Sequence, residues 1–320
     1  MGAYIIRRLL IGLVVLFFVT VILFILMNLM PGDPITAYIP PEVLAQAGPE
    51  YIEIRREQLG LNKPVVVRYF IWLNELVHGN MGYSVQNGEP VLSRIKERIG
   101  ATFELTGTAL LLAILIGIPI GIISAVRQYS IIDSLVTLFS FTGVSIPVFF
   151  LGLGLIYVFS LRLNLLPTGG LATIGAPPSL LDKLSHLIMP AFVLSVANLA
   201  QFARYTRSSI LDELGQDYVR TARAKGVKEL RVLFYHILRN GMIPLITVIA
   251  LQIPLLFGGA VITEQVFSWP GMGRLALEAI MQRDYPLLMG ITTVIAILVL
   301  IANLLADILY AVVDPRIRYQ

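Results

Sequence analysis

The sequence predicts an all-α integral membrane protein with six transmembrane helices and both chain ends in the cytoplasm. Of the 320 residues, 57% are hydrophobic and only 14% are charged. Six apolar runs are long enough to span a membrane, and basic residues concentrate in alternate connecting segments. A soluble domain is roughly 45–50% apolar and about 25% charged. This chain therefore has too few polar residues to cover a water-facing surface.

Each predicted span is close to the roughly 20 helical residues needed to cross about 30 Å of hydrocarbon. The first run follows Arg7 and Arg8. It is too long for a typical signal peptide and no small-residue cleavage site follows it, so we expect a retained helix. The fourth run is the weakest, because amide side chains interrupt it. The spans are expected at residues 9–30, 102–126, 135–160, 187–207, 242–264 and 287–313.

Basic residues predict the orientation of these spans. With the N-terminus inside, the inner segments hold 13 of the 24 Lys and Arg residues within 61 positions. The much longer exterior loops hold the other 11. Because cytoplasmic loops carry an excess of Lys and Arg, this bias favours both termini inside. The inner segments are residues 1–8, 127–134, 204–241 and 314–320.

Two connecting segments of this single domain (residues 1–320) are too long to be simple turns. Residues 31–100 form an exterior loop of about 70 residues. Its stretches "EYIEIRREQLGL" and "VVVRYFIWLNELVHG" have helical and amphipathic patterns, so we interpret the loop as a small exterior cap. The other segment is the inner loop at residues 204–241.

The inner loop reads as short helices with a turn at Gly226, where glycine interrupts the helical pattern. Asp217 could cap a helix beginning at Tyr218, and a second helix is expected from Lys228 to about Leu238. Two interpretations remain open. The basic residues could anchor the loop to anionic headgroups, or they could donate to carboxylates of a docking partner, with small residues permitting close approach. An apolar stripe with three- or four-residue spacing indicates that residues 207–238 are mostly helical, at Ile210, Leu211, Leu214, Tyr218 and Ala222.

The stretch "DYVRTARAKG" (217–226), followed by "HILRNGMIPLI" (236–246), resembles the cytoplasmic "EAA" loop of ATP-binding-cassette importer permeases. The resemblance is closest to the first, B-type permease of the oligopeptide, dipeptide and nickel transport branch. Arg220 stands where that pattern has glutamate, Thr221 replaces the first alanine, and Pro244 lies further from the glycine than in sugar-type permeases. Other matching stretches are "MPGDP" (30–34), "LGLNKPVVVRYFIWL" (59–73), "ATFELTGTALLLAILIGIPIGIISA" (101–125), "EQVFSWPGMGRL" (264–275), "RDYPLL" (283–288) and "NLLADILYAVVDPRIRY" (303–319).

The resemblance implies a subunit that forms half of a translocation pathway with a homologous second permease in a bacterial or archaeal cell (inner) membrane. Its other implied partners are two cytoplasmic ATPase subunits, an extracytoplasmic solute-binding protein and membrane lipid. The implied substrate is a di- or oligopeptide, with nickel chelates or oligosaccharides as alternatives. The implied coupling loop comprises Asp217, Tyr218, Arg220, Thr221, Ala222, Arg223, Ala224, Lys225 and Gly226.

The residues themselves argue against catalysis by this chain. No G-x-x-x-x-G-K-[ST] phosphate loop occurs, so ATP and Mg²⁺ are expected in partner subunits and no cofactor is expected here. With no cysteine and three widely separated histidines, we expect no metal site. The hydrolase motifs H-E-x-x-H and G-x-S-x-G are also missing. An ion-coupled carrier remains the alternative, but it would need an internal repeat and central ionisable residues. The net charge of +4 reflects orientation, and no nucleic-acid partner is expected.

Polar side chains within the predicted spans form a second group of candidates. Asn198, Gln201 and Gln252 are expected to make interhelical hydrogen bonds or to line the pathway. Asp307 is expected to form a structural ion pair with Arg127 or Arg204, with proton coupling as the less favoured alternative.

Five other positions carry expectations about helix packing, helix bending or the membrane interface. Gly117 and Gly121 have the small-xxx-small spacing that lets helices approach closely, although a chance glycine pair remains possible. Pro147 could kink the third span. Glu264 and Trp269 are expected at the outer membrane interface.

Overall fold

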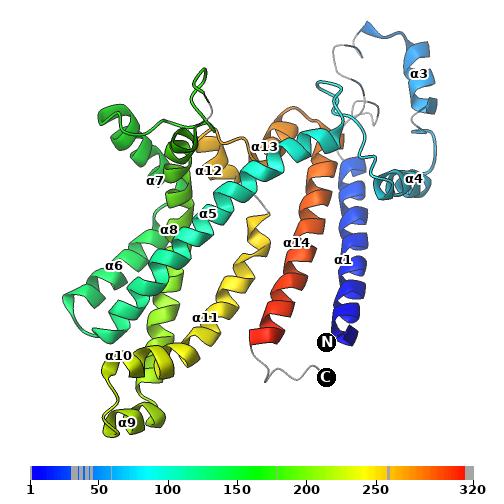
Figure 1. Cartoon of the computed structure of the whole chain (residues 1–320). Helices are drawn as coiled ribbons and strands as arrows, with labels where there is room; N and C mark the ends of the chain where they lie inside the picture. Colours follow the sequence, from blue (N-terminus) through cyan, green and yellow to red (C-terminus); the bar gives the residue numbers. More distant parts are fainter. Residues whose placement is uncertain are drawn as a thin grey trace. The chain divides into compact units, whose positions relative to one another are not determined.

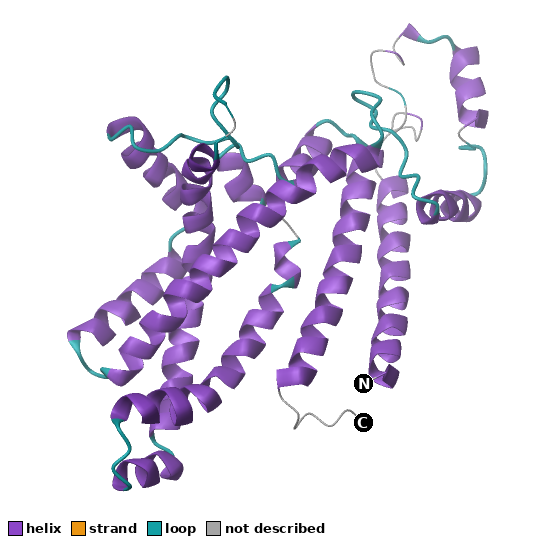
Figure 2. Ribbon diagram, viewed as in Figure 1, coloured by secondary structure: helices purple, strands orange, loops and turns teal. Residues whose placement is uncertain are grey.

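The computed structural model describes residues 2–29, 35, 39, 43, 46–58, 60–177, 179–257 and 260–313. Helices account for nearly all regular structure in that part of the chain (Figure 2). Its only β element is an isolated bridge between Tyr83 and Pro90. The expected all-α fold is confirmed.

Five helical stretches are long and apolar enough to cross a membrane, and a bent helix pair raises the number to six among the described residues. The five are Ile6–Leu29, Val91–Val126, Leu180–Leu214, Glu229–Leu256 and Tyr285–Ile308. The bent pair is Ile131–Ser145 with Val148–Arg162.

The chain divides into two compact units. Unit 1 comprises residues 1–101 and 271–301, and unit 2 comprises residues 102–270 and 302–320. Figure 1 labels the helices. Unit 1 holds α1 (Gly2–Leu29), α3 (Pro49–Gln58), α4 (Val65–Val77), the start of α5 (Val91–Val126), α13 (Met272–Met281) and most of α14 (Tyr285–Val313).

The first turns of α5 form the main core of unit 1 with α13 and α14. Val91 and Ile95 pack with Leu275 and Ile291, and all four are buried. Gly290 permits this contact, since a Cβ there would lie 2.4 Å from a methyl group of Val91. Nearby, the buried hydroxyl of Ser84 donates to the Asp284 carboxylate.

Unit 2 contains most of the helices around the predicted inner loop. After the rest of α5 come α6 (Ile131–Ser145), α7 (Val148–Leu155), η2 (Ile156–Arg162), α8 (Leu180–Leu214), α9 (Asp217–Ala224), α10 (Glu229–Val232), η3 (Leu233–Ile237), α11 (Leu238–Gln252), η4 (Pro254–Leu256) and α12 (Val261–Val266).

The two glycines of α5 lie directly against α8. A Cβ at Gly117 would lie 2.8 Å from the carbonyl oxygen of Leu199, and one at Gly121 would lie 2.5 Å from that of Ala203. Backbone atoms cannot give way as flexible side chains can, so larger residues would force the helices apart. The small-xxx-small spacing therefore marks a helix contact.

Helix boundaries differ from the expected spans in four places. The second helical stretch, α5, begins at Val91 rather than at residue 102. The third span bends by 104° between α6 and α7, because Pro147 holds the preceding Ile146 in an extended conformation. The fourth helix, α8, extends well beyond residues 187–207 at both ends. The fifth helical stretch covers Glu229–Leu256 rather than 242–264, so it begins within the predicted inner loop.

Two residues expected at the outer interface are buried instead. Glu264 on α12 is completely buried, and its carboxylate accepts a hydrogen bond of 3.0 Å from Thr102 Oγ1 on α5. Trp269 is also completely buried. Both side chains are therefore enclosed by protein rather than exposed to headgroups, and their depth in the membrane stays a prediction.

Candidate docking site

The candidate site is built on α9, a two-turn helix between α8 and the helical stretch that begins at Glu229. Val219 and Ala222, three positions apart, are buried on one face of α9. They pack in one apolar cluster with Ala125 of α5, Ile210 of α8 and Ile237 of η3. The helix is therefore fixed to the ends of longer helices rather than suspended on a flexible loop.

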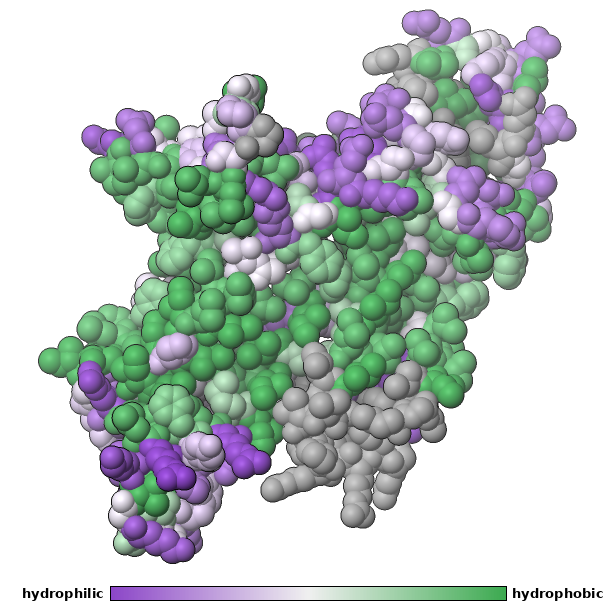
Figure 3. Space-filling view, in the orientation of Figure 1, coloured by the Kyte–Doolittle hydropathy of each residue, from purple (hydrophilic) through white to green (hydrophobic). Residues whose placement is uncertain are grey.

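The opposite face of α9 is polar and exposed. Figure 3 shows hydrophilic side chains gathered over α9 and α10, and hydrophobic side chains over the neighbouring α6. Arg220 lies 3.6 Å from Asp217, with both side chains largely exposed. The structure thus presents the predicted basic residues on a solvent-facing surface.

Arg223 forms an ion pair with another residue of the same loop. Its Nε and Nη2 atoms donate to the two carboxylate oxygens of Glu229 at 2.9 and 3.1 Å. This fork-shaped pair joins the end of α9 to the start of α10 across the turn. Arg223 therefore has an internal partner, whereas Lys225 beside it is exposed.

The turn after α9 depends on Gly226, whose φ is +74°. The Gly226 amide donates to the carbonyl of Arg223 at 2.9 Å, and the Val227 amide donates to that of Ala222 at 3.2 Å. These two bonds form a Schellman motif, which needs a left-handed residue at this position. Val227 also packs against the cluster containing Ala222. Glycine is favoured because other residues adopt positive φ at a cost.

The start of α9 differs slightly from the expectation. Asp217 is the first helical residue rather than the cap, and the preceding Gln216 gives no side-chain cap. A carboxylate in the first turn still stabilises the positive end of the helix dipole. The second expected helix, from Lys228 to about Leu238, continues without a break into α11.

Tyr218 fastens α9 to the helices on both sides. Its hydroxyl donates to the Glu213 carboxylate at the end of α8. It accepts a bond of 3.2 Å from Asn240 Nδ2 at the start of α11. Burial, and then the bond to Glu213, raises the pKa of the Tyr218 phenol above its usual value. The shift keeps the phenol in the protonated form that donates to Glu213.

An ion pair that the sequence did not reveal lies beside this cluster. Arg207 of α8 donates to both carboxylate oxygens of Asp133 of α6, at 2.6 and 2.9 Å. Asp133 is almost fully buried. It also accepts bonds from Ser124 Oγ of α5 at 2.5 Å and from the Tyr129 amide at 3.0 Å. One carboxylate therefore joins α5, α6 and α8 next to the residues that hold α9.

The sequence contains a local signal for one member of this ion pair, Asp133. Ser130 caps α6 by accepting a bond from the Asp133 amide, and the S-x-x-D spacing is typical of a helix start. The partner Arg207 is 74 positions away. In the sequence, Arg207 contributes only to the charge bias that predicts the orientation.

Two of the predicted polar residues meet between helices. Gln252 Nε2 of α11 donates to Gln201 Oε1 of α8 at 3.5 Å. Asn198 lies one turn from Gln201 on α8 and is half-buried. Asp307 is half-buried on α14. Its pairing with Arg127 or Arg204 stays a prediction.

These elements define a helical protein that crosses the membrane several times. Its short amphipathic helix α9 packs against the ends of the longer helices. The chain belongs to the family described as "Binding-protein-dependent transport system inner membrane component", whose model matches residues 117–319. The corresponding N-terminal family, "Binding-prot-dependent transport system membrane comp, N-term", matches residues 1–106. The chain is thus a multi-pass inner-membrane protein, and the resemblance seen in its motifs is confirmed.

Curated relatives cover the full length of the chain. It is 48% identical over 320 residues to "Oligopeptide transport system permease protein AppB" of Bacillus subtilis, covering 100% of both chains. It is 38% identical over 345 residues to "Dipeptide transport system permease protein DppB" of Escherichia coli, covering 99% of both. "Glutathione transport system permease protein GsiC" of Escherichia coli is 40% identical over 317 residues, again with 99% coverage of both chains.

A solved structure shares the fold at much lower identity. It is described as "Inward facing conformations of the MetNI methionine ABC transporter", with a TM-score of 0.55 and 17% identity. The match covers 71% of this chain and 99% of that chain. At this identity the similarity supports the fold alone.

Proposed function

We propose that this chain is the permease subunit of an ATP-driven, binding-protein-dependent importer of di- or oligopeptides. Family membership supports transport with a separate binding protein. The printed names of full-length relatives support peptides as the substrate class. Nickel chelates and oligosaccharides remain the alternatives for the same machinery.

The observation that best supports a coupling role is that α9 has one packed face and one exposed face. Val219 and Ala222 pack into the bundle, while Arg220 and Lys225 face solvent. A partner that pushes on the exposed face would move the inner ends of α5 and α8 with it, because the packed face cannot slide independently. We propose that this face, comprising residues 217–226, docks on a cytoplasmic ATPase subunit.

ATP hydrolysis is assigned to those partners rather than to this chain. The sequence has no phosphate loop, and such loops supply the backbone amides and the lysine that hold ATP phosphates. ATP and Mg²⁺ would therefore act in the ATPase subunits, and this chain would convert their closure into a movement of helices.

A second permease is proposed to cover the polar side of α8. Asn198 and Gln201 are only half-buried within a membrane-crossing helix. Amides facing lipid would lack hydrogen-bond partners, so protein or pathway water is expected on that side. Together the two permeases would form the translocation pathway, to which an extracytoplasmic binding protein delivers peptide.

The test is transport in sealed proteoliposomes containing the purified complex, with the ATPases on the accessible side and the binding protein and labelled peptide inside. We expect peptide movement to require ATP and to persist after ion gradients are collapsed with ionophores. Transport that follows an ion gradient and ignores ATP would refute the proposal and favour a secondary carrier. A matched preparation with non-hydrolysable nucleotide is the control.

A further inference from the structure

Helix α4 (Val65–Val77) exposes a continuous apolar face. Val66, Phe70 and Val77 are 66%, 57% and 77% exposed, respectively. Their spacing of four and seven residues places them on one side of the helix. No charged residue lies between them on that side, because Arg68 and Glu75 project elsewhere. An apolar face of this kind is unfavourable in water.

The side of α4 adjacent to this face packs firmly against α1. Tyr69 is buried, and its hydroxyl lies 2.9 Å from Thr20 Oγ1 of α1. The Phe24 ring packs edge-on against Tyr69 at 5.5 Å and lies 5.8 Å from the ring of Trp72. Met289 of α14 completes this cluster. The position of α4 along α1 is therefore fixed by specific contacts.

Those contacts place α4 below the outer end of the first span. If Arg7 and Arg8 mark the inner boundary, the roughly 20 residues that cross the hydrocarbon end near Asn28. Phe24 and Thr20 then lie about 6 and 12 Å below the outer boundary, at ~1.5 Å per residue. α1 also exposes Ile22 and Ile25 over this depth, as a lipid-facing helix does.

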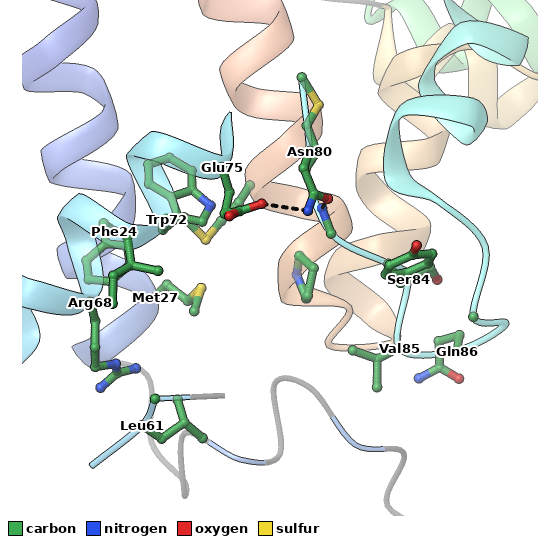
Figure 4. A pocket seen from close by; sticks show the side chains of 18 residues that line it. Phe24, Met27, Leu61, Arg68, Trp72, Glu75, Asn80, Ser84, Val85 and Gln86 are labelled. Carbon is green, nitrogen blue, oxygen red and sulfur yellow. Dashed lines mark hydrogen bonds between the residues drawn. The ribbon is translucent and has the colours of Figure 1, made fainter. Parts of the chain in front are cut away.

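A third side of α4 faces a cavity of about 620 Å³. Figure 4 shows Arg68, Trp72 and Glu75 around it, with Glu75 Oε2 accepting a bond of 2.8 Å from Asn80 Nδ2. The charged side chains of α4 thus point toward a partly polar, partly open space within unit 1. They lie on the other side of the helix from Val66, Phe70 and Val77.

We infer that α4 is an outer-leaflet helix, with Val66, Phe70 and Val77 embedded among lipid acyl chains. Amphipathic helices commonly bury their apolar face about 5–10 Å into this zone of a bilayer. Arg68 and Glu75 remain on the cavity side, separated from lipid by the body of the helix. This assignment goes beyond the proposed transport function and does not depend on ATPase docking.

The absence of cysteine from the sequence permits a direct test. Single cysteines would be introduced by Val66→Cys, Phe70→Cys and Val77→Cys. The full-length chain, with the subunits that accompany it, would be spin-labelled in phospholipid nanodiscs. Collision rates would then be measured with oxygen, which concentrates in lipid, and with a water-soluble nickel chelate.

Matched positions calibrate the measurement. Ile22→Cys on α1 gives the lipid reference, and Glu53→Cys on the exposed side of α3 gives the water reference. Ile71→Cys replaces an apolar residue on the same helix that lines the cavity. We expect the three test positions to match Ile22→Cys, with frequent oxygen collisions and little access for the chelate. Ile71→Cys is expected to collide with the chelate more often than Phe70→Cys.

Two results would overturn the inference. Chelate access at positions 66, 70 and 77 equal to that of Glu53→Cys would place this face in water. Low collision rates with both reagents would mean that a protein partner covers it. Neither result would bear on ATP-dependent transport, so this inference and the proposed function can fail separately.

Discussion

At the scale of single residues, Gly226 determines how α9 ends. A Cβ at this position would meet nothing within 4 Å in this chain. The need for glycine here therefore comes from the positive φ and not from crowding by neighbouring residues. Any requirement for a small residue would have to come from a docked partner. Substitutions at Gly226 can thus distinguish the effect of backbone geometry from the effect of contact with a partner.

The first prediction uses this difference. Asparagine tolerates left-handed geometry better than most residues, so Gly226→Asn should preserve the turn and retain most ATPase association. Gly226→Trp adds bulk and a backbone cost of roughly 1–2 kcal/mol, and should sharply reduce association. The measurement is the amount of ATPase co-purifying with equal amounts of the membrane chain. Unchanged co-purification and transport in the tryptophan variant would count against a coupling role.

Asp133 and Arg207 form the second residue-level feature. The Asp133 carboxylate accepts four hydrogen bonds from three different parts of unit 2. Removing one partner of a buried pair leaves the other charge uncompensated, which typically costs about 3–5 kcal/mol. Replacing both partners with apolar residues costs much less. The effects of substituting Asp133 and Arg207 on the free energy of unfolding should therefore not be additive.

Thermal unfolding in detergent can test this coupling. Asp133→Leu and Arg207→Met should each lower the Tm strongly, while the double variant should recover much of the loss. The difference between the double effect and the sum of the single effects measures the interaction. Ser134→Ala, at the neighbouring position, serves as the control. Additive single effects would show that the two side chains do not stabilise one another.

At the scale of the element, α9 differs from a loop that simply carries positive charge. Arg223 is bound to Glu229, so its charge contributes less to any outward-facing surface. Arg220 and Lys225 lie on the exposed surface. A headgroup anchor would respond to net charge alone, whereas a docking surface would respond to position.

Charge reversal distinguishes these two cases. Arg220→Glu and Lys225→Glu change the net charge equally, so an anchor predicts equal losses of ATPase association. Docking predicts unequal losses, since the two side chains would meet different partner groups. Arg223→Glu paired with Glu229→Arg should retain the loop, because the ion pair is restored in reverse. Equal losses in Arg220→Glu and Lys225→Glu would favour anchoring at the membrane surface.

Much of α9 could be predicted from sequence because its signals are local. The apolar stripe and Gly226 indicated two helices separated by a turn, and the structure has both. The bend at Pro147 had a local signal, but its extent depends on packing. The burial of Glu264 had no local signal, because its partner Thr102 is 162 positions away in the sequence. Separation in the sequence also concealed the Asp133–Arg207 pair.

At the scale of the whole molecule, the chain combines membrane-crossing helices with the proposed docking helix α9, and its sequence has no phosphate loop. We therefore propose that partner subunits hydrolyse ATP. The family assignment places it in transport systems that include a separate binding protein. The central claim is therefore mechanical: the exposed face of α9 receives force from an ATP-hydrolysing partner.

A site-specific cross-link from α9 tests that claim most directly. Thr221 is exposed on α9, and the chain has no other cysteine to react, so Thr221→Cys can carry a short photoreactive group. In the transport-active complex, we predict a cross-link to an ATPase subunit, and none from Ile22→Cys on the lipid-facing side of α1. An active complex in which Thr221→Cys reaches only lipid, or no nucleotide-hydrolysing subunit, would contradict the account.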